Sequence, residues 1–185
     1  MGWLLFGAFL FLFGALAENQ DRPTFEVLEK NEEYETRRYG VTVWITTKIP
    51  DESVPEITKS RDRLVKYCKK IEDNGYGTCS TNWPVLVNVT NDAEYSLSWF
   101  LVSDSDVSTL IPDPDVTVRH LLGGIAYVKK FGGTPSIESG KENAKTLREA
   151  LANAGQTFNP HVYCGAGYDP FLSVTHHNEI WIFKT

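Results

Sequence analysis

The side chains that could do chemistry in this chain are few and widely spaced. It has four histidines and three cysteines, and His176 and His177 stand together in a loop before an apolar closing segment. His161 and Cys164 are three residues apart in an expected strand, which points them to opposite faces and makes them a poor chelate. The sequence contains no G-x-S-x-G, H-E-x-x-H, P-loop, G-x-G-x-x-G or C-x-x-C motif. An enzyme is therefore the weaker hypothesis.

The first seventeen residues predict export. Residues 1–17 (MGWLLFGAFLFLFGALA) form an uncharged apolar run that ends in small residues. Small residues at positions −3 and −1 suit a signal peptidase, so we expect cleavage before Glu18 and a secreted mature chain, 18–185, with no stable membrane insertion. The run is shorter than the ~20 residues of a membrane span. An uncleaved anchor is the alternative, since no Lys or Arg precedes the run.

The charge and the cysteine content indicate which partners and covalent bonds to expect. The net charge is −6 and the basic residues form no block, which argues against a nucleic-acid partner. In an oxidising compartment, Cys68 and Cys79 could form a disulfide worth roughly 3 kcal/mol, with Cys164 left as a buried thiol. Three free thiols are the alternative. Asn88 begins an N-x-T glycosylation sequon, which matters only if the chain is secreted.

Apolar periodicity predicts alternating strands and helices. Strands are expected over 25–30, 34–49, 82–90, 94–102, 116–121, 125–131, 162–167 and 178–184. One helix is expected over 51–73, capped by Asp51 or Ser53. A second is expected from Ser136 or Ser139 to about Ala154, because Ser139-x-x-Glu142 has the form of a capping box. The acidic segment 103–115 matches no EF-hand loop.

The expected elements repeat along the chain. Strand, strand, helix, strand, strand is followed by the same series, and the segment 38–44 echoes 119–127. Such a unit cannot cover its own sheet face, so two halves are expected to share one core. The prediction is an α+β domain: a duplicated ββαββ-type unit that forms a distorted antiparallel β-barrel or curved sheet flanked by two α-helices.

Several short segments, in their order along the chain, are typical of one family. They are YETRRY at 34–39 before a V-x-V-W strand, NWPV at 82–85, FGG at 131–133, GYDP at 167–170 and NEIW at 178–181. With these segments the chain resembles the SOUL/haem-binding protein family over essentially all of 18–185. The resemblance implies the fold derived above and non-covalent binding of haem or a related tetrapyrrole. In that family the ligand lies between the first helix and the loop before the last strand.

The resemblance points to specific binding residues. Haem is flat and apolar and carries two propionates, so its site needs an apolar slot with cations at one edge. The implied set is Ile57, Arg61, Leu64, Val65 and Lys66 from the helix, with Phe171, Leu172, Val174, His176 and His177 from the loop. Arg61 interrupts the apolar stripe of the helix, which marks either the edge of the buried face or a side that faces a ligand. The alternative is that the apolar residues fill the core and the cations face solvent.

The resemblance does not carry over an iron ligand. One branch of the family has a histidine, proposed as an iron ligand, where this chain has Arg38, and the only methionine is Met1. His176 and His177 become the axial candidates, and at most one can reach a single iron if the segment is extended. We expect a secreted, non-catalytic carrier or scavenger of tetrapyrroles. A secreted module that binds a protein partner or another small apolar ligand is the alternative, and a hydrolase-like enzyme is a third.

Overall fold

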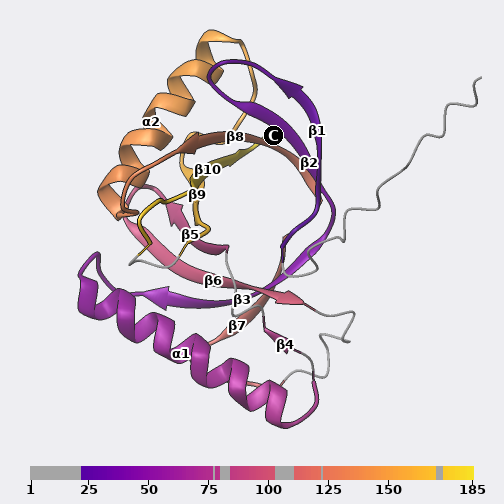
Figure 1. Ribbon diagram of the computed structural model, residues 1–185, viewed down its shortest axis with the longest axis vertical. Coiled ribbons are helices and arrows are strands. Elements are labelled where there is room, and N and C mark those ends of the chain that lie inside the picture. Colours follow the sequence, from indigo (N-terminus) through magenta and orange to yellow (C-terminus); the bar gives the residue numbers. More distant parts are fainter. Residues whose placement is uncertain (1–21, 77, 80–83, 103–110, 122, 170–172) are drawn as a thin grey trace, which may run out of the picture.

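A strongly curved antiparallel sheet forms the body of the protein, and two helices lie on its outer surface (Figure 1). The computed structural model describes residues 22–76, 78–79, 84–102, 111–121, 123–169 and 173–185. The strands are β1 (Phe25–Lys30), β2 (Glu35–Tyr39), β3 (Thr42–Ile49), β4 (Thr78–Cys79), β5 (Val85–Thr90), β6 (Glu94–Val102), β7 (Thr117–Leu121), β8 (Gly124–Phe131), β9 (Val162–Gly167) and β10 (Asn178–Phe183). The helices are α1 (Val54–Asp73) and α2 (Ile137–Asn153), and neither is long and apolar enough to cross a membrane.

Both helices begin at a serine that caps them. The hydroxyl of Ser53 accepts a hydrogen bond from the N–H of Glu56 at the start of α1 (3.4 Å). At the start of α2, the hydroxyl of Ser136 accepts from the N–H of Ser139 (3.0 Å). The capping box therefore joins Ser136 and Ser139. The predicted box of Ser139 with Glu142 is wrong, because the helix begins one turn earlier.

The strand order carries the duplication that the sequence predicts. Along the sheet the order is β1-β2-β8-β10-β9-β5-β6-β3-β7, with β4 beside β6. The first half supplies β2, β3, α1, β5 and β6, and the second supplies their counterparts β7, β8, α2, β9 and β10. If each strand in the stretch β2-β8-β10-β9-β5-β6-β3-β7 is replaced by its counterpart from the other half, the same eight strands result in the reverse order. The two halves are therefore arranged symmetrically in the sheet. The α+β prediction is confirmed. Within the described residues no pairing joins β1 to β7, so the sheet is curled and not closed.

The two faces of the sheet have different coverings. Residues that pair directly across antiparallel strands point to the same face. The inner face buries an apolar cluster that contains Trp44 and Trp181. The outer face buries a larger cluster with Leu64 of α1 and Leu147 of α2. Helix α1 packs chiefly on β3, and α2 on β10 and β8 (Figure 1). The outer face of the central pair β5–β9 therefore lies between the two helices.

Candidate functional site

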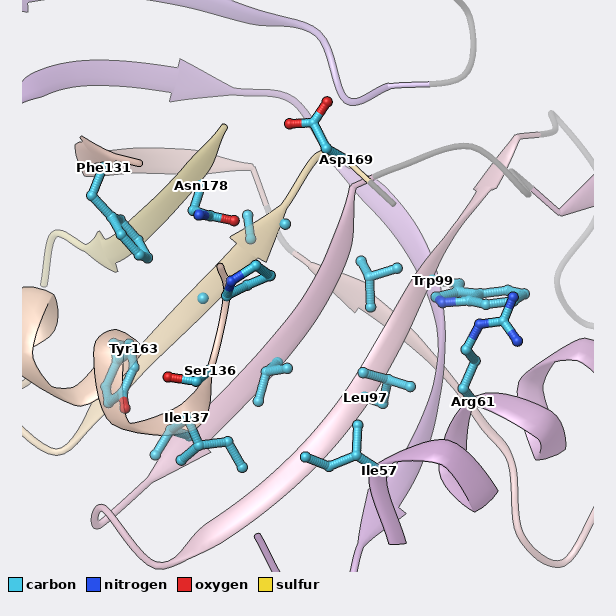
Figure 2. A pocket seen from close by; sticks show the side chains of 18 residues that line it. Ile57, Arg61, Leu97, Trp99, Phe131, Ser136, Ile137, Tyr163, Asp169 and Asn178 are labelled. Atoms are coloured by element: carbon cyan, nitrogen blue, oxygen red, sulfur yellow. The ribbon is translucent and has the colours of Figure 1, made fainter. Parts of the chain in front are cut away.

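An apolar groove follows the outer face of β5 and β9 between the two helices (Figure 2). It encloses about 240 Å³. Val85, Val87 and Val89 line its floor from β5, because alternate residues of a strand share a face. Helix α1 contributes Ile57 and Arg61 to one wall, and the start of α2 forms the other. Each half of the duplicated fold thus supplies one wall and part of the floor.

The groove owes its depth to two glycines of β9. Gly165 pairs with Val87, and Gly167 pairs with Val85. A methyl group added at Gly165 would find its nearest neighbours, Ile180 Cδ1 and the carbonyl oxygen of Val87, at 4.0 Å. That distance is ordinary van der Waals contact, so crowding does not require glycine at this position. The missing side chain is what leaves the hollow.

Polar groups stand mainly at the ends and rim of the groove. Figure 2 shows Arg61 and Trp99 at one end, Tyr163 and Phe131 toward the other, and Asp169 on the rim. Among the described residues that line the groove, Arg61 is the one cation and Asp169 the one acid. The carboxylate of Asp169 accepts a hydrogen bond from the N–H of His177 (2.6 Å). An apolar slot with one cation at its end suits an apolar ligand with one anionic edge.

The predicted residues of α1 are divided between the groove and other surroundings. Ile57 and Arg61, one helical turn apart, line the groove. Leu64 is completely buried in the core beneath α1, while Val65 and Lys66 are exposed to solvent. Arg61 therefore interrupts the apolar stripe because it stands on the side of the helix that faces the groove. It is the one cation of the predicted set that the structure brings there.

Of the predicted apolar residues of the loop, Val174 is the one that the structure describes, and it does not line the groove. Phe171 and Leu172 lie outside the described residues. Val174 is fully exposed, since its side chain projects from the loop. The floor of the groove comes from β5, β6 and β9, and its residues Trp99 and Gly165 were not among those expected from the sequence.

The two adjacent histidines lie beside the groove and do not line it. His177 directs Nε2 toward Glu179 Oε1 (3.2 Å) and packs its ring against that of Tyr168 (4.9 Å between centroids). His176 is partly buried, and neither histidine lines the groove. Within the described ranges, no group of three or more His, Cys, Asp or Glu side chains could hold a metal ion. The structure therefore does not bring His176 or His177 together with Ile57 and Arg61.

Buried charges on the inner face were missed at the level of sequence. Nη2 of Arg37 donates to Glu35 (2.7 Å) and to Glu179 (2.9 Å), and the side chains of Arg37 and Glu179 are only 1% and 2% exposed. Tyr168 and Trp181 also donate to Glu179, each at 2.8 Å. Glu35 and Arg37 are two residues apart in a strand, so the sequence predicts that their side chains share a face. That spacing was the one signal of this cluster in the sequence. Their partner Glu179 comes from the far end of the chain.

The cluster of Arg37, Glu35 and Glu179 keeps both of its carboxyl groups ionised. Burial raises the pKa of Glu35, but hydrogen bonds from Lys130 and Arg37 outweigh it and lower that pKa to about 2. Burial likewise opposes the hydrogen bonds of Arg37 at Glu179, and the pKa of Glu179 is lowered overall. Both carboxylates are therefore ionised at neutral pH. The cluster joins β2 to β10 and, through His177, reaches the loop beside the groove.

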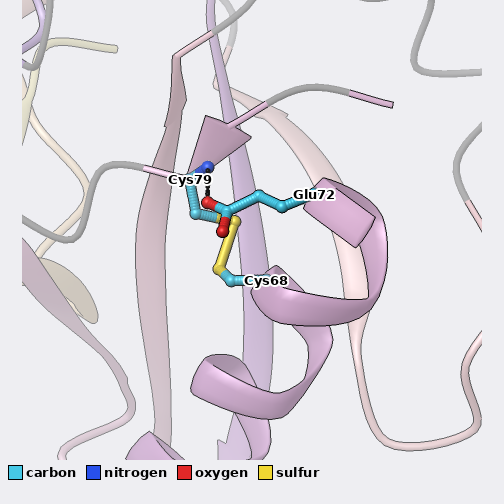
Figure 3. The surroundings of a disulfide bond; sticks show 3 residues. All are labelled: Cys68, Glu72 and Cys79. Atoms are coloured by element: carbon cyan, nitrogen blue, oxygen red, sulfur yellow. Dashed lines mark hydrogen bonds between the residues drawn. A yellow bond between two sulfur atoms is a disulfide. The ribbon is translucent and has the colours of Figure 1, made fainter. Parts of the chain in front are cut away.

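A disulfide bond holds the helix that forms one wall of the groove. Cys68 of α1 is bonded to Cys79 of β4, with their Cα atoms 5.6 Å apart, and Glu72 accepts from the N–H of Cys79 at 3.2 Å (Figure 3). The predicted pairing is confirmed. Cys164 is free and buried on the inner face, and burial raises its pKa to about 12. At neutral pH Cys164 is a thiol, so it is neither a nucleophile nor a thiolate ligand.

Removing the disulfide should destabilise the protein measurably. Cys68 and Cys79 are 11 residues apart, and closing a loop of that size in the unfolded chain is worth about 3 kcal/mol. Replacing both by alanine should lower the free energy of unfolding by about that amount, measured by urea denaturation with circular dichroism. A reducing agent should bring the wild type to the same value and leave the double variant unchanged. Equal stability of the two oxidised proteins would mean that packing alone holds α1.

Asn88 faces the inside of the curled sheet. Its amide nitrogen donates to the hydroxyl of Ser98 (2.7 Å) and to that of Ser96 (3.3 Å), and its oxygen accepts from the thiol of Cys164 (3.2 Å). A glycan would replace one of the two N–H hydrogens on this nitrogen, so at least one of the donated bonds would be lost, and the sugar would have to occupy the interior. The geometry therefore argues against a glycan at the predicted sequon in the folded chain.

Comparison with known proteins agrees with this fold. The chain is similar to Heme-binding protein 2 of Mus musculus, 28% identical over 163 residues, with 82% of this chain and 78% of the relative covered. It is similar to Heme-binding protein 1 of Mus musculus, 26% identical over 159 residues, with 82% and 84% covered. A solved hydrolase from Listeria innocua superposes with a TM-score of 0.57 at 10% identity, covering 85% of this chain and 94% of that one. At that identity the likeness concerns the fold alone.

A family model covers nearly the whole chain. It is described as SOUL heme-binding protein and matches residues 20–183, which includes both helices and all the strands described above. The match spans both halves of the duplicated unit and the groove between them. The chain belongs to the SOUL heme-binding protein family.

Proposed function

We propose that the protein binds haem or a related tetrapyrrole in the groove between α1 and α2, as a secreted carrier or scavenger that catalyses no reaction. The observation that carries the proposal is the apolar groove with Arg61 at one end, in a family whose curated relatives are named heme-binding proteins. A tetrapyrrole is a flat apolar ring with carboxylates at its edge. It therefore matches a slot that is apolar along its length and cationic at one end.

The size of the groove sets how a macrocycle would sit. Its volume of about 240 Å³ is a little below the ~300–1,000 Å³ of pockets that enclose drug-sized ligands. We expect the ring to insert one part between the helices and to leave the rest outside. Such a site releases its ligand more readily than a closed pocket, which suits a carrier.

Recognition of the ring is expected to dominate over recognition of iron. Among the described residues that line the groove there is no histidine, cysteine or methionine. Haem bound there would supply its own iron chemistry, while this chain supplies the apolar walls and the charge of Arg61. Ser136 is the one serine among the described lining residues, and its hydroxyl caps α2 instead of meeting a base. That supports binding without catalysis.

A titration with two related ligands tests the proposal. Hemin and metal-free protoporphyrin should each bind the purified protein saturably at one equivalent, observed through the Soret band and porphyrin fluorescence. His176→Ala and His177→Ala should change either affinity by less than about threefold, because neither side chain lines the groove.

Other outcomes would separate the alternatives. Binding of hemin alone, lost together with a shifted Soret band in one histidine variant, would show that the loop supplies an axial ligand. Absence of binding by either ligand at one equivalent would exclude the carrier role. A secreted module for another ligand would then be favoured.

Two features support the proposed secretion. Residues 1–17 have the composition of a signal peptide, and the Cys68–Cys79 disulfide suits an oxidising compartment. Protein recovered from the medium of expressing cells should begin at Glu18, which N-terminal sequencing would establish. Retention in the membrane fraction with Met1 intact would contradict the proposal.

A further inference from the structure

One edge of the groove lies next to the turn between β5 and β6. Val89 pairs with Tyr163 of β9 on one side and with Tyr95 of β6 on the other, so the three side chains form one row on the outer face. Val89 and Tyr163 line the groove, whereas Tyr95 stands at its border. Figure 2 shows Ile57 of α1 and Ile137 of α2 on opposite walls above this part of the floor. A contact that joins the walls beyond these residues therefore limits how wide the groove can open.

An ion pair bridges the two walls at this edge. Nζ of Lys141, in α2, donates to Oε1 of Glu52, two residues before α1, at 2.5 Å. Lys141 directly follows Gly140, which lines the groove. Within the described residues, no other ion pair or side-chain hydrogen bond joins α1 or Glu52 to α2. This one polar contact therefore ties the walls together.

Tyr95 holds the ion pair at the border of the floor. Its hydroxyl lies 2.5 Å from the same Oε1 of Glu52, with the carbonyl oxygen of Asp92 as a second acceptor at 2.7 Å. Nζ of Lys141 lies 5.4 Å from the centre of the Tyr95 ring, within the range of a cation–π contact. Tyr95 is 6% exposed, while the side chains of Glu52 and Lys141 are 47% and 35% exposed. The pair thus rests on a buried residue but is itself in contact with solvent, where ion pairs are weak.

We propose that Glu52, Tyr95 and Lys141 form a clasp that limits the size of the ligand that the groove accepts. With the clasp closed the groove encloses about 240 Å³, and a ligand as wide as a tetrapyrrole inserts further only by parting the clasp. A smaller apolar molecule needs no such opening. Glu52 and Lys141 are therefore positioning residues, because they do not line the groove and act through the distance between its walls. This inference rests on the proposed function and adds a determinant of ligand size to it.

Removing the clasp in advance should favour the large ligand. Lys141→Met keeps an unbranched side chain without the charge. It should raise the affinity for metal-free protoporphyrin, measured by porphyrin fluorescence, about threefold, which corresponds to the contribution of one exposed ion pair. Tyr95→Phe should act in the same direction, and Lys141→Arg, which keeps a cation opposite Glu52, should bind as the wild type does. The affinity for anilinonaphthalene sulfonate, a much smaller apolar probe, should be unchanged in all three variants.

Lys145→Met is the matched control. Lys145 lies one turn further along α2, is exposed, and forms no ion pair within the described part of the chain. Its replacement therefore removes the same charge without touching the clasp and should leave the affinity for protoporphyrin close to that of the wild type. Because salt screens exposed charges, the difference between Lys141→Met and the wild type should vanish at high ionic strength. A purely structural effect of the substitution would persist there.

The possible results separate the clasp from the proposed function. Equal affinity of Lys141→Met and Lys145→Met for protoporphyrin, or an equal rise for the porphyrin and the small probe, would overturn the clasp while leaving groove binding intact. Absence of porphyrin binding by the wild type and by Lys141→Met alike would instead remove the proposed function, and the role of the clasp with it. If Tyr95→Phe does not fold, Glu52→Gln at its exposed position takes its place in the same comparison.

Discussion

Replacing Arg37 by leucine should lower the free energy of unfolding by about 3–5 kcal/mol. The guanidinium is almost completely buried, at 1% exposure, and lies 2.7 Å from Glu35 and 2.9 Å from Glu179. Leucine would leave Glu179 buried without that cation and close to Glu35, which would keep only its pairs with Lys130 and Lys30. Urea denaturation followed by tryptophan fluorescence would measure the loss.

Arg38, which follows Arg37 in β2, provides a matched control. Arg38 lies on the opposite face of β2, where its exposed side chain pairs with exposed Glu26 at 2.8 Å. An ion pair of this kind contributes less than about 1 kcal/mol, so Arg38→Leu should have little effect. Similar losses in the two variants would mean that the inner charges are solvated and not dependent on Arg37.

The stability that Arg37→Leu loses relative to the wild type should depend on pH in a defined direction. In the wild type the pKa of Glu35 is lowered from 4.5 to about 2, with burial opposed by Lys130 and Arg37. A lowered pKa gives stability that is present above pH 4.5 and disappears as the pH falls toward 2. In Arg37→Leu, Glu179 is buried without that cation, which favours its protonated form, so this variant should gain stability as the pH falls from neutrality. The difference between the two proteins should therefore shrink on acidification.

The buried charges around Arg37 also show what could not be predicted from sequence patterns. Period two correctly placed Glu35 and Arg37 on one face of a strand. Nothing local indicated that this face is the inner one, because that depends on β2 pairing with β8 and β8 with β10. The helices were easier to predict, since a cap such as Ser53 and an apolar stripe are properties of one segment. The Cys68–Cys79 bond joins neighbours in sequence, and its pairing could be predicted for the same reason.

The groove was only partly predictable for a related reason. Ile57 and Arg61 were expected near a ligand, but the rotation of α1 about its axis is set by packing on β3, and this turns Leu64 into the core and Lys66 to solvent. The floor arises where β5 of one half pairs with β9 of the other. That contact joins segments about eighty residues apart, so Gly165 had no visible role in the sequence.

A larger side chain at Gly165, where β9 pairs with β5, should fill the floor of the groove and weaken porphyrin binding. Gly165 lies in a strand with its nearest neighbours 4.0 Å from an added Cβ, and glycine inside a strand weakens it. Larger residues should therefore fold at least as well as glycine. A leucine side chain would project into the space between the helices, where relieving the overlap costs about 1–3 kcal/mol, or about 5- to 150-fold in porphyrin affinity.

A graded series makes this result specific. Affinity for metal-free protoporphyrin should fall stepwise from Gly165 through Gly165→Ala and Gly165→Val to Gly165→Leu, while the unfolding midpoint stays level or rises. Gly40→Leu is the control, because Gly40 is exposed, has nothing within 4 Å of an added Cβ and does not line the groove. If the folded Gly165→Leu protein bound porphyrin as the wild type does, the ligand could not lie over β9. In that case Arg61 and Trp99 would form the rim of a hollow without a ligand.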